Sequence, residues 1–363
     1  MSGEKIMLIL VVAFIASSQS IICPKFQCGS SFPNSNQCIY FDSTNKATYI
    51  SSCSKGTYCP PTNQANSTCQ TVNPKPISRS YPGEKCSSNT NCITGVCSKD
   101  VCSGIARNQN CSLNITNNAL CEPGNYCDLT LSNPVCTELK SNLAFCTAGD
   151  QCIYGAGCYN NTYCLLYGSI QNYQIIAKSE CTNAIGYSPY CQSGQCYNFV
   201  NGTSICIEAF ESPYFDSPFQ CYENSACVSN INIKTGAAIQ GACNCAKNTE
   251  GSAFCAQFVG DYYFSRAIEL WEKWEKSGNP SKCNIDAAYT PGCLMSYYKS
   301  NDAYEILYYN YLATNYPTYV GADNCTLNVY FSDYLFLVEE YNPINSSGNQ
   351  VFGLALVIAL ALA

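Results

Sequence analysis

The residues best equipped for chemistry in this chain of 363 residues are its thirty cysteines, which all lie between Cys23 and Cys325. A thiolate can bind zinc, exchange disulfides or act as a nucleophile. The spacing C-x2-C, typical of zinc ribbons and thioredoxin-type redox centres, occurs nowhere, and "CNC" at Cys243 to Cys245 is the one tight pair. An even number of cysteines at this density is typical of a disulfide framework. We therefore expect structural disulfides, with metal binding as the alternative interpretation of the clustered cysteines.

Acid–base chemistry has few residues to draw on. Histidine is absent, which removes the commonest general base and any Ser–His or Cys–His pair. Glu269, Glu272 and Glu275 stand three residues apart, and paired carboxylates do serve glycosidases. The same spacing also fits a solvated helix face on which Glu269 pairs with Lys273 and Glu272 with Lys276. We predict no catalytic residue and no cofactor, and keep a carboxylate-based extracellular hydrolase as the least favoured alternative.

One short pattern recurs five times: cysteine, two residues, glycine, one or two residues, cysteine. The copies are "CSKGTYC" from Cys53, "CITGVC" from Cys92, "CEPGNYC" from Cys121, "CIYGAGC" from Cys152 and "CQSGQC" from Cys191. A short loop between two cysteines must turn sharply, and glycine takes positive φ at little steric cost. Recurrence every 29 to 39 residues indicates an array of similar units.

The flanking cysteines divide the array into compact and looser units. Compact units run from Cys86 to Cys102 and from Cys146 to Cys164; looser ones run from Cys38 to Cys69, Cys111 to Cys136 and Cys181 to Cys206; a sixth, divergent group holds Cys221, Cys227, Cys243, Cys245 and Cys255. Units this small cannot bury enough apolar surface to fold unaided, whereas a disulfide closing about 15 residues contributes roughly 3 kcal/mol in the chain-entropy model. We therefore predict small disulfide-rich tandem modules built of short hairpins and turns, with little helix.

Parity constrains the pairing. Residues 23 to 255 hold 27 cysteines and the later residues hold three, so full pairing requires at least one bridge between the two segments. We predict Cys255–Cys283 and Cys293–Cys325. The cysteines named as disulfide candidates are Cys53, Cys59, Cys86, Cys92, Cys97, Cys102, Cys121, Cys127, Cys146, Cys152, Cys158, Cys164, Cys191, Cys196, Cys255, Cys283, Cys293 and Cys325.

After Cys255 the cysteines thin out and aromatic residues take over. "DYYFSRAIELWEKWEKSGNP" predicts a helix that Asp261 can cap and that ends before Gly278. Its apolar stripe at helical spacing consists of Phe264, Ala267, Ile268, Trp271 and Trp274. A second helix is expected after Ser300, through "DAYEILYYNYLATNYP" and stopped by Pro317, and a third over "SDYLFLVEEY". We predict a small tyrosine-rich helical domain whose rings form a core, with a ligand or carbohydrate platform as the alternative.

The two ends predict processing. "MSGEKIMLILVVAFIASSQS" is typical of a secretory signal peptide cleaved before Ile21. The apolar tail, 351 to 363, is 13 residues long, about 20 Å as a helix against a hydrocarbon core of about 30 Å. The small residues Asn345, Ser346 and Ser347 precede it, a pattern that favours a glycosylphosphatidylinositol (GPI) attachment signal, although the polar spacer is shorter than usual. A retained hydrophobic tail is the alternative.

Further features agree with passage through an oxidising compartment. Sequons stand at Asn66, Asn110, Asn114, Asn160, Asn201 and Asn324, besides Asn345. The formal net charge is -7, without the basic stripe that a nucleic-acid binder shows, so we expect no nucleic-acid partner.

The compact unit with its leading "GEKC" resembles the Dickkopf N-terminal type of cysteine-rich module in its cysteine and glycine spacing. The layout of the whole chain resembles the cysteine-rich surface proteins of ciliate protists, a resemblance that implies a cell-surface role and supplies no catalytic residues. The expected organisation is a signal peptide over 1–20, a first cysteine-rich unit over 21–80, tandem units over 81–255, the helical domain over 256–341 and the GPI signal over 342–363.

The resulting hypothesis is a non-enzymatic surface protein acting in surface coat, recognition or adhesion. Its partners would be the outer leaflet of the plasma membrane, through the lipid, and an extracellular protein or carbohydrate ligand. The alternative from another class is a receptor-like, ligand-binding cysteine-rich ectodomain.

Overall fold

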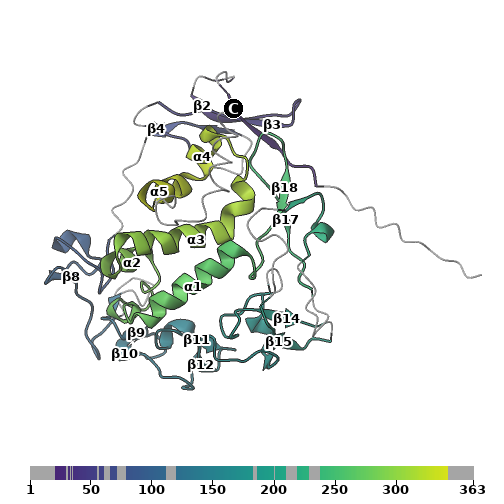
Figure 1. Ribbon diagram of the computed structural model, residues 1–363. Helices are drawn as coiled ribbons and strands as arrows, with labels where there is room; N and C mark the ends of the chain where they lie inside the picture. The colour runs from purple at the N-terminus through teal and green to yellow at the C-terminus, as the bar shows by residue number, and fades with distance from the viewer. Residues whose placement is uncertain are drawn as a thin grey trace, which may run out of the picture.

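The cysteine-rich units form a ring around a bundle of helices (Figure 1). The computed structural model describes residues 21–29, 32, 34, 36–54, 57–60, 66–71, 79–111, 120–182, 186–199, 201–209, 219–228 and 238–341. The expected signal peptide and the expected lipid-attachment site lie outside these residues, as does the sequon at Asn114. In Figure 1 the chain passes from β2 and β3 through β8, β9–β12 and β14–β15 to β17–β18, and α1 and α3 cross the middle of this circuit.

Each unit is held by two interleaved disulfides that join its first cysteine to its third and its second to its fourth. We number the units 1 (Cys38–Cys69), 2 (Cys86–Cys102), 3 (Cys111–Cys136), 4 (Cys146–Cys164), 5 (Cys181–Cys206) and 6 (Cys221–Cys255). The bonds are 38–59 and 53–69, 86–97 and 92–102, 111–127 and 121–136, 146–158 and 152–164, 181–196 and 191–206, and 221–243 and 227–255. The compact and looser units therefore share one pairing and differ in loop length.

A short antiparallel hairpin closes each of units 2 to 6. Its strands are β7 (Cys97–Ser98) and β8 (Val101–Cys102), β9 (Asn125–Asp128) and β10 (Val135–Glu138), β11 (Ala156–Tyr159) and β12 (Tyr163–Leu166), β14 (Cys196–Asn198) and β15 (Ser204–Cys206), and β17 (Cys243–Cys245) and β18 (Ala253–Cys255). In all five hairpins the third and fourth cysteines face each other across the strands. Strands β13 (Ile175–Ile176) and β16 (Gln220–Cys221) add a third strand in units 5 and 6.

Unit 1 is built on a larger sheet of order β1-β3-β2-β5. The strands are β1 (Lys25–Cys28), β2 (Gln37–Asp42), β3 (Ala47–Ile50) and β5 (Asn66–Thr68), while β4 (Thr57–Tyr58) pairs with β6 (Gln70–Thr71). Strand β1 lies at the edge of the sheet and runs parallel to β3.

The described turn glycines have the positive φ that the sequence analysis expects of them. Gly95, Gly124, Gly155 and Gly194 have φ values between 71° and 83°, the left-handed region that glycine enters without a Cβ penalty. Gly56 lies outside the described residues.

Five helices follow: α1 (Tyr262–Lys276), α2 (Pro291–Tyr297), α3 (Ser300–Tyr319), α4 (Asn324–Tyr330) and α5 (Ser332–Tyr341). Helices α1, α3 and α5 confirm the three predicted ones, while α2 and α4 were not predicted. The predicted stop at Pro317 is wrong, because α3 continues to Tyr319. Unit 6 supplies the reason: the Lys247 amide donates to the Thr318 carbonyl and the Asn248 side chain to the Val320 carbonyl, so two orphan carbonyls at the helix end are satisfied.

Two clusters form the core of the helical domain. Trp274 is fully buried against Leu270, Leu294 and Ile306, and its indole N–H donates to the Ala288 carbonyl at 3.0 Å. The second cluster gathers tyrosines from α1, α3 and α5 around Leu312. The fold is therefore a set of disulfide-rich hairpin modules followed by a tyrosine-rich helical domain, as predicted.

Two long-range disulfides tie the ends of the ring. Cys23–Cys245 joins the N-terminal segment to unit 6, and Cys28–Cys325 joins β1 to α4. The expected bridge between the cysteine-rich array and the helical domain therefore exists.

The predicted assignments of that bridge are wrong, because Cys255 pairs with Cys227 and Cys283 pairs with Cys293. Cys255 is the last cysteine of unit 6, where its hairpin holds it opposite Cys243, and Cys325 pairs with Cys28 of β1.

Among the described residues, the helices are all too short or too polar to cross a membrane.

Candidate functional site

The cysteine sulfurs form close clusters, but every one of them is already bonded. Five groups of three sulfurs lie within 4.8 Å of one another, for example Cys146, Cys152 and Cys164. Each group falls inside one unit, where the two disulfides pack together, and none of the thirty cysteines is free. A metal ligand must be a thiolate, so these groups are disulfide cores. A chain cross-linked in this way is a secreted or extracellular protein.

The three glutamates of α1 have separate partners. Glu269 binds Arg266 at 2.8 Å rather than the predicted Lys273, and Arg266 also binds Glu305 at 2.7 Å. Glu272 pairs with Lys276 at 3.0 Å as predicted.

Glu275 is half-buried and accepts a hydrogen bond from the Tyr289 hydroxyl at 3.2 Å. Burial raises the pKa of Glu275. This arrangement does not favour the paired-carboxylate hydrolase.

The aromatic residues of the helical domain do not form an open platform. Tyr263 packs against Tyr316, with ring centroids 4.7 Å apart, and Tyr319 packs against Tyr334 at 4.6 Å. Among the side chains described between 256 and 341, Phe336 has the one exposed ring, at 52%. The rings therefore serve as core, and the aromatic-groove form of the ligand-binding hypothesis loses support.

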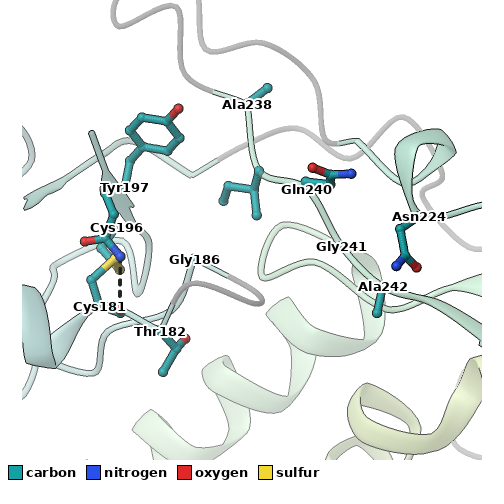
Figure 2. A pocket seen from close by; sticks show the side chains of 12 residues that line it. Cys181, Thr182, Gly186, Cys196, Tyr197, Asn224, Ala238, Gln240, Gly241 and Ala242 are labelled. Carbon is teal, nitrogen blue, oxygen red and sulfur yellow. Dashed lines mark hydrogen bonds between the residues drawn. A yellow bond between two sulfur atoms is a disulfide. The ribbon is translucent and has the colours of Figure 1, made fainter. Parts of the chain in front are cut away.

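A hollow lies instead between units 5 and 6 (Figure 2). Its volume is about 520 Å³. Unit 5 lines one side around the Cys181–Cys196 disulfide and Tyr197, and unit 6 lines the other through Asn224 and Gln240.

The described lining of this hollow is uncharged. Hydrogen bonds to the backbone fix the side chains of Asn198 and Asn224. The Asn198 side-chain amide donates to the Cys181 carbonyl at 3.2 Å, and the Asn224 side-chain oxygen accepts from the Cys243 backbone amide at 2.8 Å. An aromatic ring with positioned amide groups suits a neutral polar ligand. The hollow was not predicted, because its two walls come from separate units, within 181–198 and 224–242, and carry no motif.

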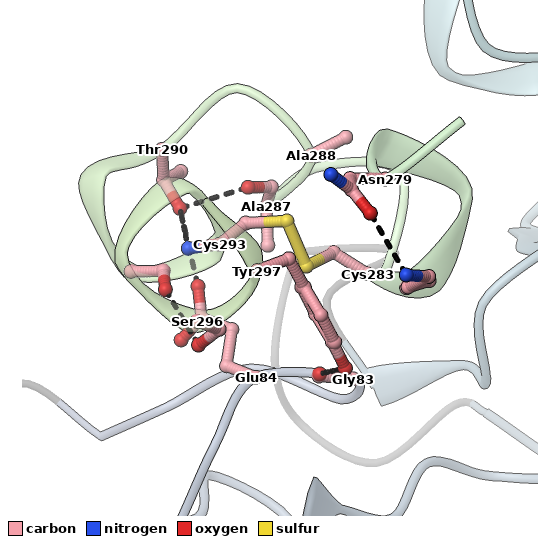
Figure 3. Close-up of a disulfide and its surroundings, with 12 residues drawn as sticks. Gly83, Glu84, Asn279, Cys283, Ala287, Ala288, Thr290, Cys293, Ser296 and Tyr297 are labelled. Atoms are coloured by element: carbon pink, nitrogen blue, oxygen red, sulfur yellow. Dashed lines mark hydrogen bonds between the residues drawn. A yellow bond between two sulfur atoms is a disulfide. The ribbon is translucent and has the colours of Figure 1, made fainter. Parts of the chain in front are cut away.

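The junction of unit 2 with the helical domain carries a buried carboxylate (Figure 3). Glu84 is 4% exposed and accepts hydrogen bonds from the Tyr81 amide at 2.9 Å and the Thr290 hydroxyl at 3.1 Å. The Tyr297 hydroxyl donates to the Gly83 carbonyl beside it. Burial raises the pKa of Glu84. Glu84 belongs to the "GEKC" sequence and its Tyr81 partner is local, but Thr290 lies 206 residues further on, so no local signal could have revealed the junction.

Neighbouring contacts extend this junction to units 3 and 4. The buried Asn284 side chain donates to the Cys121 carbonyl at 2.8 Å, and its backbone amide donates to the Pro82 carbonyl at 2.9 Å. The Tyr154 hydroxyl donates to the Cys283 carbonyl at 2.6 Å. The ring is thus bonded to the helical domain through many polar contacts.

The described sequon asparagines are exposed: Asn66, Asn110, Asn160, Asn201 and Asn324. Asn160 and Asn201 stand in the hairpin turns of units 4 and 5. Asn324 opens α4, but the hydroxyl-bearing Thr326 of its sequon is fully buried, so a glycan at this position must be added before α4 packs.

Comparison with known proteins gives one limited likeness. A Caenorhabditis elegans protein described as "Prion-like-(Q/N-rich) domain-bearing protein 25" is 27% identical over 188 residues, which cover 49% of this chain and 25% of that protein. This chain therefore spans about a quarter of that curated relative. No family model matches, and no solved structure matches.

Proposed function

We propose that this protein is a non-enzymatic component of the cell surface, held on the outer leaflet by a GPI lipid and acting in surface coat, recognition or adhesion. The observation that carries the proposal is the complete pairing of thirty cysteines into fifteen disulfides. Such a framework withstands an oxidising exterior. Exposed sequon asparagines on three of the six units and on α4 are consistent with a glycosylated surface.

The lipid anchor is tested on intact cells that express the full chain. Treatment with a phosphatidylinositol-specific phospholipase C should release most of the protein into the medium. Substituting Ser346 and Ser347 with bulky residues should abolish surface display, because attachment needs small residues. Retention of the wild-type protein after phospholipase treatment, with a known lipid-anchored protein released in parallel, would reject the anchor.

A second candidate function is binding of a neutral polar ligand in the hollow between units 5 and 6. The uncharged lining around Tyr197 and Gln240 favours an oligosaccharide over an ionic ligand. Tyr197→Ala should weaken binding to an oligosaccharide panel by at least tenfold, while Tyr222→Ala, which changes an exposed ring outside the lining, should not. Equal binding by the two variants would remove this candidate.

A further inference from the structure

One disulfide differs from all others in both position and exposure. Twelve of the fifteen bonds lie inside the six units, Cys283–Cys293 is local to the helical domain, and Cys23–Cys245 closes the ring. Cys28–Cys325 alone joins the array to the helical domain. Cys28 is also the one exposed cysteine among the thirty, whereas Cys325 is 8% exposed.

The segments that this bond joins have a modest non-covalent contact. Strand β1 is an edge strand that pairs with β3 alone. Phe26 packs with its ring 5.9 Å from that of Tyr330 on α4, and the Lys247 ammonium group lies 5.2 Å from the first ring and 4.7 Å from the second. Such ring and cation contacts are individually weak. Breaking the disulfide would leave α4 held to the sheet by these contacts and by the apolar packing of Val329 and Tyr330 on Phe26 and Ile50.

We propose that Cys28–Cys325 is a redox-labile latch that an extracellular dithiol reductant opens while the bonds inside the units stay closed. The attacking thiolate approaches at the exposed residue Cys28 and attacks its sulfur, the S–S bond breaks, and Cys325 leaves as a thiolate. The second thiolate of the reductant then displaces Cys28 from the mixed disulfide. The reductant ends as a disulfide, and its two electrons and two protons end on Cys28 and Cys325. Access decides the order of reduction, because exchange requires approach to a sulfur.

Opening the latch has a defined structural consequence. Cys23–Cys245 still closes the ring, and the Phe26 amide still donates to the Asn248 carbonyl at 2.8 Å, so β1 stays in place. Helix α4 loses its covalent tie to β1 and is held to the sheet of unit 1 by non-covalent contacts alone, so local opening there exposes the apolar face formed by Phe26, Ile50 and Tyr330. The latch thus controls access to a buried surface without unfolding a unit.

The test uses the full chain, produced through the secretory pathway and titrated with dithiothreitol under native conditions. Newly free thiols are alkylated and mapped by mass spectrometry, and hydrogen exchange is measured in parallel. Cys28 and Cys325 should become labelled at least tenfold faster than any other pair, and amide exchange should rise in α4 but not in units 2 to 6. Cys28→Ser with Cys325→Ser should show the raised exchange in α4 without reductant.

Two results would overturn the latch: earlier reduction of another disulfide, or unchanged exchange in α4 once Cys28 and Cys325 are labelled. If the double serine variant fails to fold, the wild-type titration decides by itself. Cys53–Cys69 is the internal comparison, because both of its cysteines are partly accessible but lie inside one unit.

Discussion

Burial raises the pKa of Asp286 to about 6, so the ionisation of this residue opposes folding. Glu84 and Glu275 likewise oppose, through their ionisation, the packing of the ring against the helical domain. Both carboxylates are at least half-buried and accept hydrogen bonds from uncharged donors, Thr290 and Tyr289 among them. Burial disfavours the charged form of a carboxylic acid and raises its pKa. At neutral pH the charged carboxylates therefore lower the free energy of unfolding, and their protonation raises it again.

Stability should therefore depend on pH through Glu84. The folded-state pKa of Glu84 lies above its ordinary value of 4.5, so the folded protein binds more protons between the two values. Stability then rises as pH falls through that window and is lost as pH rises through the folded pKa. Glu84→Gln imitates the protonated form, so its thermal midpoint should exceed that of the wild type at pH 7 and converge with it near pH 4.

The control is Glu272→Gln, which removes an exposed carboxylate paired with Lys276 and should change the thermal midpoint little, because an exposed ion pair contributes at most about 1 kcal/mol. Parallel midpoint–pH curves for the wild type and Glu84→Gln would contradict this role of Glu84.

Local elements were predictable wherever a short pattern determines them. The turn glycines and the apolar stripe of α1 are such patterns, because a positive φ or a buried helix face leaves a local mark in the sequence. The end of α3 was not predictable, because contacts from Lys247 and Asn248 in unit 6 satisfy the carbonyls beyond Pro317. The pairing Cys227–Cys255 did carry a signal: without Cys245, the sixth group has the four-cysteine order of the other units.

A substitution at Gly83 tests how closely the segment that leads into unit 2 must approach the helical domain. Its φ is +90°, and an added Cβ would overlap the Lys282 carbonyl oxygen and lie 2.7 Å from the Cys283 Cα. Gly95, inside unit 2, has φ +72° and no atom within 4 Å of an added Cβ. Gly95→Ala should therefore cost about 1–2 kcal/mol from backbone strain alone. Gly83→Ala should cost roughly 1–3 kcal/mol more because of overpacking.

Denaturant unfolding with the disulfides intact measures both variants. Because the extra cost arises where Gly83 contacts Lys282 and Cys283, Gly83→Ala should also increase proteolytic cleavage of the two segments that meet there. Equal destabilisation by Gly83→Ala and Gly95→Ala would mean that this contact is looser than the structure shows.

At the scale of the whole molecule, the sequence indicated tandem units but not their arrangement. The units curve into a ring whose inner side packs on the helical domain (Figure 1). Cys23 and Cys245 are 222 residues apart, and spacing cannot predict such pairs because connectivity is not encoded locally. Parity required a bridge to the helical domain, yet only the folded ring identifies Cys28 as its source.

Loss of the ring-closing bond Cys23–Cys245 should lower the stability of several units together, whereas loss of a bond inside one unit should affect that unit alone. In the chain-entropy model a loop of about 100 residues contributes about 4.7 kcal/mol and one of about 15 residues about 3 kcal/mol. The unit disulfides shorten the path between Cys23 and Cys245 only in part, since each spans 10 to 28 residues. Cys23→Ser with Cys245→Ser should therefore lower the free energy of global unfolding by about 4 kcal/mol and raise amide exchange across several units. Cys53→Ser with Cys69→Ser, which opens a 16-residue separation, should raise exchange in unit 1 alone. Exchange confined to the N-terminal segment after loss of Cys23–Cys245 would show that the helical domain, rather than this bond, holds the ring closed.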